Sequence, residues 1–125
     1  MKKKIVILGA TGSIGKTLIN ILKINKNDFE ILLLTANKNL NDLLKQVNLF
    51  NVKNIIITNY EEYILAKEKL KNKKINIYNN FNELDKIFKN KKIDYAMSAI
   101  SGIEGLNPTL KIIKFTKEIA IANKE

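Results

Sequence analysis

Short apolar runs alternate with amphipathic segments along the whole chain. Continuous apolar runs are typical of strands buried on both faces of a parallel sheet, and apolar residues spaced by three and four are typical of helices that bury one face. The runs predict strands at residues 5–8, 29–34, 54–58, 75–78, 93–100 and 118–122. The spaced positions predict helices at 14–22, 40–50, 63–70, 81–88 and from about 108 to 113. This alternation predicts one α/β domain over residues 1–125, a Rossmann-like, doubly wound, mostly parallel sheet with helices on both faces.

Three glycines, Gly9, Gly12 and Gly15, follow the first predicted strand at intervals of three. A strand, a glycine turn and a helix form the opening unit of a dinucleotide-binding fold, where the glycines permit a sharp turn, a close pyrophosphate and a closely packed helix. Unpaired N–H groups at the helix start favour a phosphate, and Thr11 and Ser13 add hydroxyl donors. Because the spacing is GxxGxxG and not GxGxxG, a merely tight connection stays open as the alternative.

The end of the second predicted strand is where dinucleotide-binding folds select their cofactor. An Asp or Glu near this point binds the ribose 2′-hydroxyl of NAD. Residues 35–39 contain no acid, whereas Lys38 and Asn39 offer a positive charge and hydrogen-bond donors. These groups suit a 2′-phosphate, so the segment favours NADP. The alternative is one more surface lysine among many.

The net charge of +10 suggests a nucleic-acid partner, but the kind of basic residue argues against one. All 22 basic residues are lysines spread over the chain, and arginine is the residue that most often reads bases or grips phosphates bidentately. We therefore expect a solvated lysine surface and no nucleic acid. The chain also has no Cys and no His, which excludes disulfides, thiolate metal sites and histidine catalysis within it.

The apolar runs are too short for a membrane protein. None approaches the roughly 18–20 residues that span a bilayer, and the run after the first lysines breaks at Gly9, too early for a signal peptide. These features predict a cytoplasmic domain without a membrane partner.

Three motifs occur in order: GATGSIG at residues 9–15, AIxGxxGLxPT at 99–109 and ANKE at 122–125. Together they resemble the N-terminal NADPH-binding domain of 1-deoxy-D-xylulose 5-phosphate reductoisomerase, and the likeness covers essentially the whole chain. The resemblance implies an oxidoreductase and isomerase. That family uses NADPH with Mg²⁺ or Mn²⁺ to make 2-C-methyl-D-erythritol 4-phosphate in the non-mevalonate (MEP pathway) route to isoprenoids.

The resemblance also implies binding residues. The cofactor-binding residues would be Thr11, Gly12, Ser13, Ile14, Asn37, Lys38, Asn39, Asn123 and Glu125. Lys124 would reach the phosphorylated sugar substrate, and an ammonium at the carboxyl edge of the sheet can steady a phosphate or a developing oxyanion. Many members have Gly at the position of Asn37, and Asn tolerates a left-handed backbone better than most residues, so the turn would survive.

Family members run to several hundred residues, and their metal-binding carboxylates follow the ANKE motif. The resemblance therefore implies a fragment with no catalytic residue and no metal ligand of its own, which binds NADPH but does not turn over. The full-length enzyme is expected to be a homodimer. The alternatives are another NADP-dependent oxidoreductase with a GATGxxG turn, such as aspartate-semialdehyde dehydrogenase, or a non-catalytic nucleotide-sensing domain. The former needs a nucleophilic cysteine, which this chain lacks.

Overall fold

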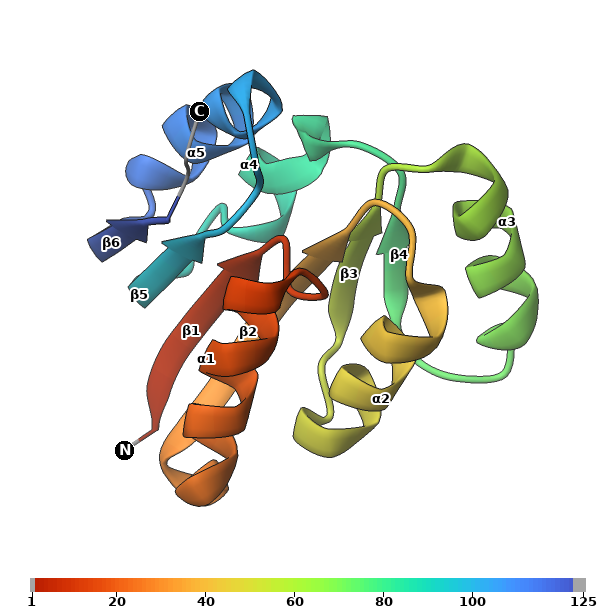
Figure 1. Cartoon of the computed structure of the whole chain (residues 1–125), viewed down its shortest axis with the longest axis horizontal. Helices are drawn as coiled ribbons and strands as arrows, with labels where there is room; N and C mark the ends of the chain where they lie inside the picture. The colour runs from red at the N-terminus through yellow and green to blue at the C-terminus, as the bar shows by residue number, and fades with distance from the viewer. Residues whose placement is uncertain (1, 123–125) are drawn as a thin grey trace.

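The structure is a computed structural model that describes residues 2–122. These residues form one sheet with helices on both faces (Figure 1). The strands are β1 (Lys3–Leu8), β2 (Phe29–Ala36), β3 (Asn54–Ile57), β4 (Asn76–Tyr78), β5 (Ile93–Ser98) and β6 (Thr116–Ile121). The α-helices are α1 (Ser13–Ile24), α2 (Leu40–Phe50), α3 (Tyr60–Lys69), α4 (Leu84–Ile87) and α5 (Leu106–Ile113). Short 3₁₀ turns are η1 (Lys26–Asp28), η2 (Phe81–Glu83) and η3 (Ile103–Gly105).

The six strands lie in the order β4-β3-β2-β1-β5-β6, and every neighbouring pair is parallel. The chain moves outward from β1 through β2, β3 and β4, then returns to the other side of β1 with β5 and β6. The order therefore reverses between β1 and β5. In open α/β sheets the crevice outside the carboxyl ends of the strands at such a point is where ligands bind.

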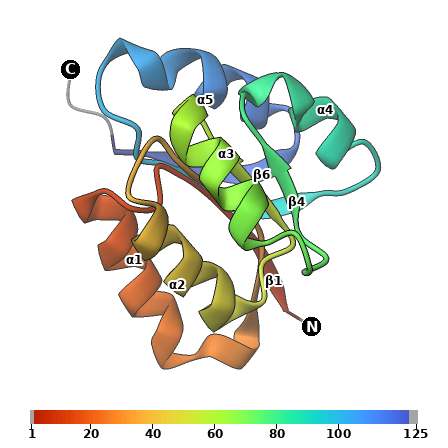
Figure 2. The same ribbon diagram turned by 90° about the vertical axis from the view of Figure 1, so that its right-hand side faces the viewer.

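Two apolar cores lie on opposite faces of the sheet, which confirms the doubly wound architecture. Ile5 and Ile7 of β1 point into the core that α1, α2 and α3 cover. Val6 and Leu8, the alternate residues of the same strand, point into the core that α4 and α5 cover. Figure 2 shows α1 and α2 on one side of the strands and α4 and α5 on the other. Burial on both faces explains why β1 has no polar alternation.

A bulge in β2 interrupts this alternation. Ile5 pairs with Ile31 but Val6 pairs with Leu33, so Leu32 is an extra residue on β2. As a result Leu32 and Leu33, although consecutive, both contribute to the α4 and α5 core. An extra residue of this kind locally increases strand twist.

Most predicted elements are confirmed, and the differences lie at their ends. The last helix begins at Leu106 and not near Pro108. Proline is tolerated there because the first-turn N–H groups of a helix have no intrahelical acceptor. The third helix begins at Tyr60, because the Asn59 side chain accepts a hydrogen bond from the Glu62 N–H at 3.0 Å and caps it. The segment predicted as a helix at 81–88 is η2 followed by a single α-helical turn.

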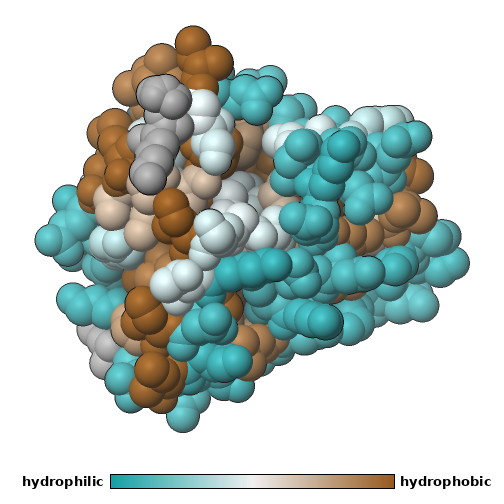
Figure 3. Space-filling model, in the orientation of Figure 1, coloured by the Kyte–Doolittle hydropathy of each residue, from teal (hydrophilic) through white to brown (hydrophobic). Residues whose placement is uncertain are grey.

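Polar residues cover most of the face in Figure 3, and apolar side chains gather over α5 at its upper left. Ile103, Leu106, Leu110 and Ile113 are all exposed, at intervals of three and four. Leu106, Leu110 and Ile113 form a stripe on the outer side of α5 that Ile103 of η3 extends, whereas Ile112 of the same helix is buried in the core.

Asp94 ties three strands together at the amino edge of the sheet, away from the glycine turn. Its carboxylate accepts a hydrogen bond from the Lys4 N–H at 2.8 Å and pairs with the Lys117 ammonium at 3.4 Å. The hydrogen bond from Lys4, helped by Lys117, holds the pKa of Asp94 below its usual 3.8. Because the pKa is lowered in the folded state, Asp94 stabilises the fold above pH 3.8 and this contribution disappears as the pH falls through the lowered pKa.

We expect Asp94→Asn to flatten the acid limb of the stability curve. At pH 7 the variant should unfold at lower urea concentration than the unmodified chain, and the gap should close as the pH falls below 3.8. Urea titrations followed by circular dichroism at several pH values measure this. Asp28→Asn removes an exposed carboxylate and is the control. A gap that stays constant with pH would show that Asp94 acts through packing alone.

Candidate functional site: a cleft at the carboxyl edge of the sheet

The glycine turn leaves β1 at the reversal of strand order. Gly9 has a φ of +79°, and a Cβ there would lie 3.0 Å from the Ala99 backbone in the loop after β5. A Cβ on Gly15 would lie 2.6 Å from the Ala10 carbonyl oxygen. Gly9 is thus required for the turn, and Gly15 lets α1 approach the backbone of the turn that precedes it.

The N-terminus of α1 is open toward a ligand. Gly12 is the N-cap, no side chain from the described part of the chain caps the helix, and no acidic residue lies in its first turn. The first intrahelical bond runs from the Lys16 N–H to the Gly12 carbonyl at 2.9 Å. The N–H groups of the first helical residues therefore keep no partner within the helix, and they carry its partial positive charge. Among residues 2–122, the Gly9 oxygen at 3.9 Å is the one heavy atom near a Cβ built on Gly12, so these residues leave the space over this turn open.

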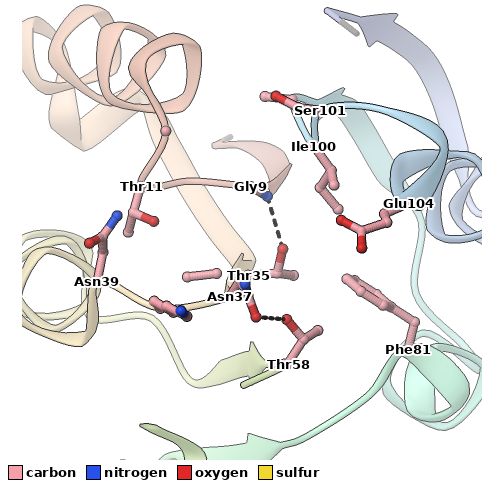
Figure 4. A pocket seen from close by; sticks show the side chains of 14 residues that line it. Gly9, Thr11, Thr35, Asn37, Asn39, Thr58, Phe81, Ile100, Ser101 and Glu104 are labelled. Carbon is pink, nitrogen blue, oxygen red and sulfur yellow. Dashed lines mark hydrogen bonds between the residues drawn. The ribbon is translucent and has the colours of Figure 1, made fainter. Parts of the chain in front are cut away.

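A cleft of about 670 Å³ extends from this turn across the edge of the sheet. Its lining residues are Gly9, Thr11, Gly12, Thr35, Ala36, Asn37, Lys38, Asn39, Thr58, Phe81, Ala99, Ile100, Ser101 and Glu104. In Figure 4, Thr11 and Asn39 stand on one side of the cleft, and Phe81 and Glu104 stand on the other. The segments after five neighbouring strands, β1 to β5, thus meet at one hollow.

Of the predicted cofactor residues, the structure brings Thr11, Gly12, Asn37, Lys38 and Asn39 into this cleft. Ser13 and Ile14 open α1 beside it and are exposed, but their side chains do not line it. Asn123, Lys124 and Glu125 lie outside the described residues.

The loop after β2 is held by the two residues that follow β3. The Thr58 hydroxyl donates to Oδ1 of Asn37 at 2.9 Å (Figure 4), and the Asn59 N–H donates to the Asn37 carbonyl at 3.2 Å. The left-handed residue in this loop is Asn39, with a φ of +43°, and not Asn37. The expectation of a left-handed Asn37 is therefore corrected: the turn is made two residues later, at the N-cap of α2.

Lys38 lies between two hollows. Besides the main cleft, it lines a second one of about 710 Å³ between α2 and α3, which Glu61, Glu62 and Lys69 also line. Within residues 2–122, Lys38 forms no ion pair. Its ammonium is thus available to an anion at the end of β2.

Sequence reasoning missed several lining residues. Thr35 and Thr58 stand at the carboxyl ends of β2 and β3, and Phe81 and Glu104 come from η2 and η3. The sequence does mark Thr35 and Thr58, because each is the polar residue at which an apolar run ends. Phe81 and Glu104 gave no such signal, because only the strand order brings η2 and η3 to the edge where the glycine turn lies.

A buried pair of hydroxyls fixes the loop after β5. The Thr109 hydroxyl donates to the Gly105 carbonyl at 2.6 Å, so its oxygen accepts the hydroxyl proton of Ser98, also at 2.6 Å. Both side chains are buried. They tie the end of β5 to the start of α5 and so set the position of residues 99–105 along the cleft.

We expect Thr109→Val to destabilise the fold by about 1–3 kcal/mol, because it leaves the buried Ser98 hydroxyl without its partner. The matched control is Thr17→Val. Thr17 makes the same hydroxyl bond to the carbonyl four residues earlier, at 2.9 Å, but in an exposed position. Urea unfolding should separate the two variants, and equal losses would contradict a special role for the buried pair.

The described residues do not offer a metal site. Within residues 2–122 no three His, Cys, Asp or Glu side chains come together. A divalent cation of the family enzyme therefore has no ligand set in this part of the chain. Among the described residues no helix is long and apolar enough to cross a membrane.

The family model and two relatives all point to the same family. The family model for 1-deoxy-D-xylulose 5-phosphate reductoisomerase matches residues 5–125. The reductoisomerase of Pelagibacter ubique is 59% identical over 124 residues, which is 98% of this chain and 32% of the relative. That of Phocaeicola vulgatus is 37% identical over the whole chain and 33% of the relative. The chain thus spans about a third of the length of these relatives.

Solved structures agree with the sequence match. The chain resembles the reductoisomerase of Zymomonas mobilis in complex with NADPH, with a TM-score of 0.86 and 31% identity over 98% of this chain and 32% of that one. It also resembles a reductoisomerase in complex with NADPH, fosmidomycin and magnesium, with a TM-score of 0.84 and 28% identity over 97% of this chain and 30% of that one. The chain belongs to the 1-deoxy-D-xylulose 5-phosphate reductoisomerase family.

Proposed function

We propose that this chain is the NADPH-binding portion of an enzyme that converts 1-deoxy-D-xylulose 5-phosphate to 2-C-methyl-D-erythritol 4-phosphate. The supporting observation is that the glycine turn and Lys38, which lie 26 or more residues apart in the sequence, line one cleft at the reversal of strand order. A turn for the diphosphate and a cation for the 2′-phosphate in one hollow are what NADPH requires. The family match favours this over another GATGxxG dehydrogenase.

The cleft suggests how NADPH lies. Its diphosphate would rest on the N–H groups at the start of α1, beside Thr11, with the 2′-phosphate at Lys38. The nicotinamide half would then extend toward Ile100 and Ser101, the far end of the cleft. Phe81 and Ile100, the apolar side chains of the cleft lining, would limit the access of water to the hydride that bound NADPH would supply there.

Asn123 and Glu125 are proposed to contact NADPH, and Lys124 is proposed to contact the sugar phosphate. The residue before them supports this. The Ala122 N–H donates to the Ser98 carbonyl at 2.8 Å, so β6 ends beside the strand that leads into the cleft-lining loop. The cytoplasmic location stays a prediction.

Turnover is proposed for the longer protein and not for these 125 residues. The chain covers about a third of its relatives, and its described residues provide no ligand set for a divalent cation. We infer that the chain alone binds NADPH without converting substrate. A homodimer is proposed for the full-length enzyme.

Calorimetric titration of the chain with NADPH, NADH and duplex DNA tests the proposal. We expect NADPH to bind at least about tenfold more tightly than NADH, a difference of about 1.4 kcal/mol. Equal affinities would contradict the role of Lys38. Salt-sensitive DNA binding without dinucleotide binding would replace the proposal with a nucleic-acid function, because counterion release makes such binding steeply dependent on salt.

A further inference from the structure

Gln46 is a buried polar residue that neither the sequence motifs nor the cleft lining includes. It lies on α2 with 7% of its surface exposed. Its Nε2 donates to the carbonyl oxygen of Ala10, 36 residues earlier in the chain, at 3.0 Å. Its Oε1 is buried and has no hydrogen-bond partner among residues 2–122.

This arrangement is a poor way to stabilise a core. One hydrogen bond gained by Nε2 is offset by the desolvation of an unpaired Oε1. Its neighbours on the inner face of α2, Leu43 and Val47, are apolar. A methionine would fill the same space without an unpaired oxygen. What distinguishes Gln46 from a methionine is therefore its hydrogen bond to the Ala10 carbonyl oxygen.

That group lies inside the glycine turn. The Gly9 N–H donates to the Thr35 hydroxyl at 2.9 Å, and the Ala10 N–H donates to the Thr35 carbonyl at 2.8 Å. Thr35 thus holds the two N–H groups at the start of the turn, and Gln46 holds the Ala10 carbonyl oxygen. These three hydrogen bonds come from Thr35 of β2 and Gln46 of α2. They leave free the opposite side of the turn, where there is open space over Gly12.

The planarity of the peptide bond gives the contact of Gln46 a consequence for the ligand. In a trans peptide the carbonyl of one residue and the N–H of the next point in opposite directions. Holding the Ala10 oxygen against α2 therefore turns the negative end of this peptide away from the cleft. It also aims the Thr11 N–H away from α2, and Thr11 lines the cleft.

We propose that Gln46 is a positioning residue for the dinucleotide diphosphate, an inference that rests on the proposed binding of NADPH. It orients the peptide between Ala10 and Thr11 so that an N–H, and not a carbonyl oxygen, faces the ligand. Because α2 begins directly after Lys38 and Asn39, the same contact fixes the distance between the diphosphate turn and the 2′-phosphate loop.

Gln46→Met tests the proposal, with Asn48→Met, an exposed and neutral position on the same helix, as the matched control. We expect Gln46→Met to raise the Kd for NADPH about tenfold by calorimetry. The Kd for adenosine 2′-monophosphate, which has no diphosphate, should not change. The thermal midpoint should move by less than about 2 °C, because the lost bond is offset by removal of the unpaired oxygen. Asn48→Met should change the Kd of neither NADPH nor adenosine 2′-monophosphate.

The outcomes separate the two proposals. If the unmodified chain binds NADPH and Gln46→Met binds it equally well, or loses both ligands to the same extent, the positioning role is wrong. If the unmodified chain does not bind NADPH, the proposed function fails. Amide hydrogen exchange then decides the inference: Gly9 and Ala10 should exchange faster in Gln46→Met and not in Asn48→Met, and unchanged exchange overturns it.

Discussion

Gly15→Ala is expected to destabilise the fold by about 3 kcal/mol or more, at the upper end of what overpacking costs. The added methyl group would meet the carbonyl oxygens of Gly9 and Ala10, the latter at 2.6 Å. These are backbone atoms, and the turn that carries them is held by Thr35 and Gln46. The turn cannot move aside without breaking those bonds, so α1 must shift away from the sheet. Urea unfolding followed by circular dichroism measures the loss.

Gly12→Ala is the matched variant, because it adds the same methyl group three residues earlier, at the N-cap of α1. Here the nearest heavy atom is the Gly9 oxygen at 3.9 Å, and the backbone, at φ −76° and ψ 174°, suits any residue. Alanine is a poorer N-cap than glycine, but it also reduces the entropy of the unfolded chain. The stability should therefore change by less than about 1 kcal/mol.

Gly12→Ala should instead weaken NADPH binding by about tenfold or more, because the methyl group occupies the space in which the diphosphate is proposed to approach the backbone. Gly15→Ala and Gly12→Ala thus separate the two purposes of the motif, packing and ligand approach. If both variants lost stability alike and the folded fraction of Gly12→Ala bound NADPH normally, the turn would be a structural connection only.

The sequence predicted the sheet well because burial on both faces leaves a simple pattern. The apolar run from Ile5 to Leu8 has no polar alternation, and the structure explains this by two cores that share the strand. Element ends were less predictable. The start of α3 depends on the cap by Asn59, and the start of α5 depends on a proline being accommodated in its first turn. The spacing of apolar residues carries no information on either feature.

The cleft was predictable only where a motif marks it. The glycine turn and the loop of Lys38 follow from the fingerprint, because its spacing fixes both positions relative to β1 and β2. Phe81, Glu104 and Gln46 could not be found this way. They come from segments far apart in the sequence, and a polar residue in the apolar face of α2 looks in sequence like an ordinary irregularity.

Lys38→Glu is expected to weaken NADPH binding by about tenfold to a hundredfold and NADH binding by less than about threefold. Two unit charges 4 Å apart interact by about 1 kcal/mol in water and about 4 kcal/mol near a protein surface. In the proposed binding mode, the variant replaces attraction to the 2′-phosphate by repulsion. NADH carries no phosphate at this position, so only the weaker field at the diphosphate changes. Calorimetry with both nucleotides at one ionic strength measures the ratio of the two affinities.

Lys69→Glu is the control for the general loss of positive charge. Lys69 lines the second hollow beside Lys38, with Glu61 and Glu62, but not the main cleft. The charge change is identical, so a long-range field effect would lower NADPH affinity in both variants. A contact with the 2′-phosphate would lower NADPH affinity in Lys38→Glu alone. Added salt would reduce the difference in affinity between the two variants only in part, because a close ion pair is screened less than distant charges. Equal losses of NADPH and NADH in Lys38→Glu would place the 2′-phosphate elsewhere.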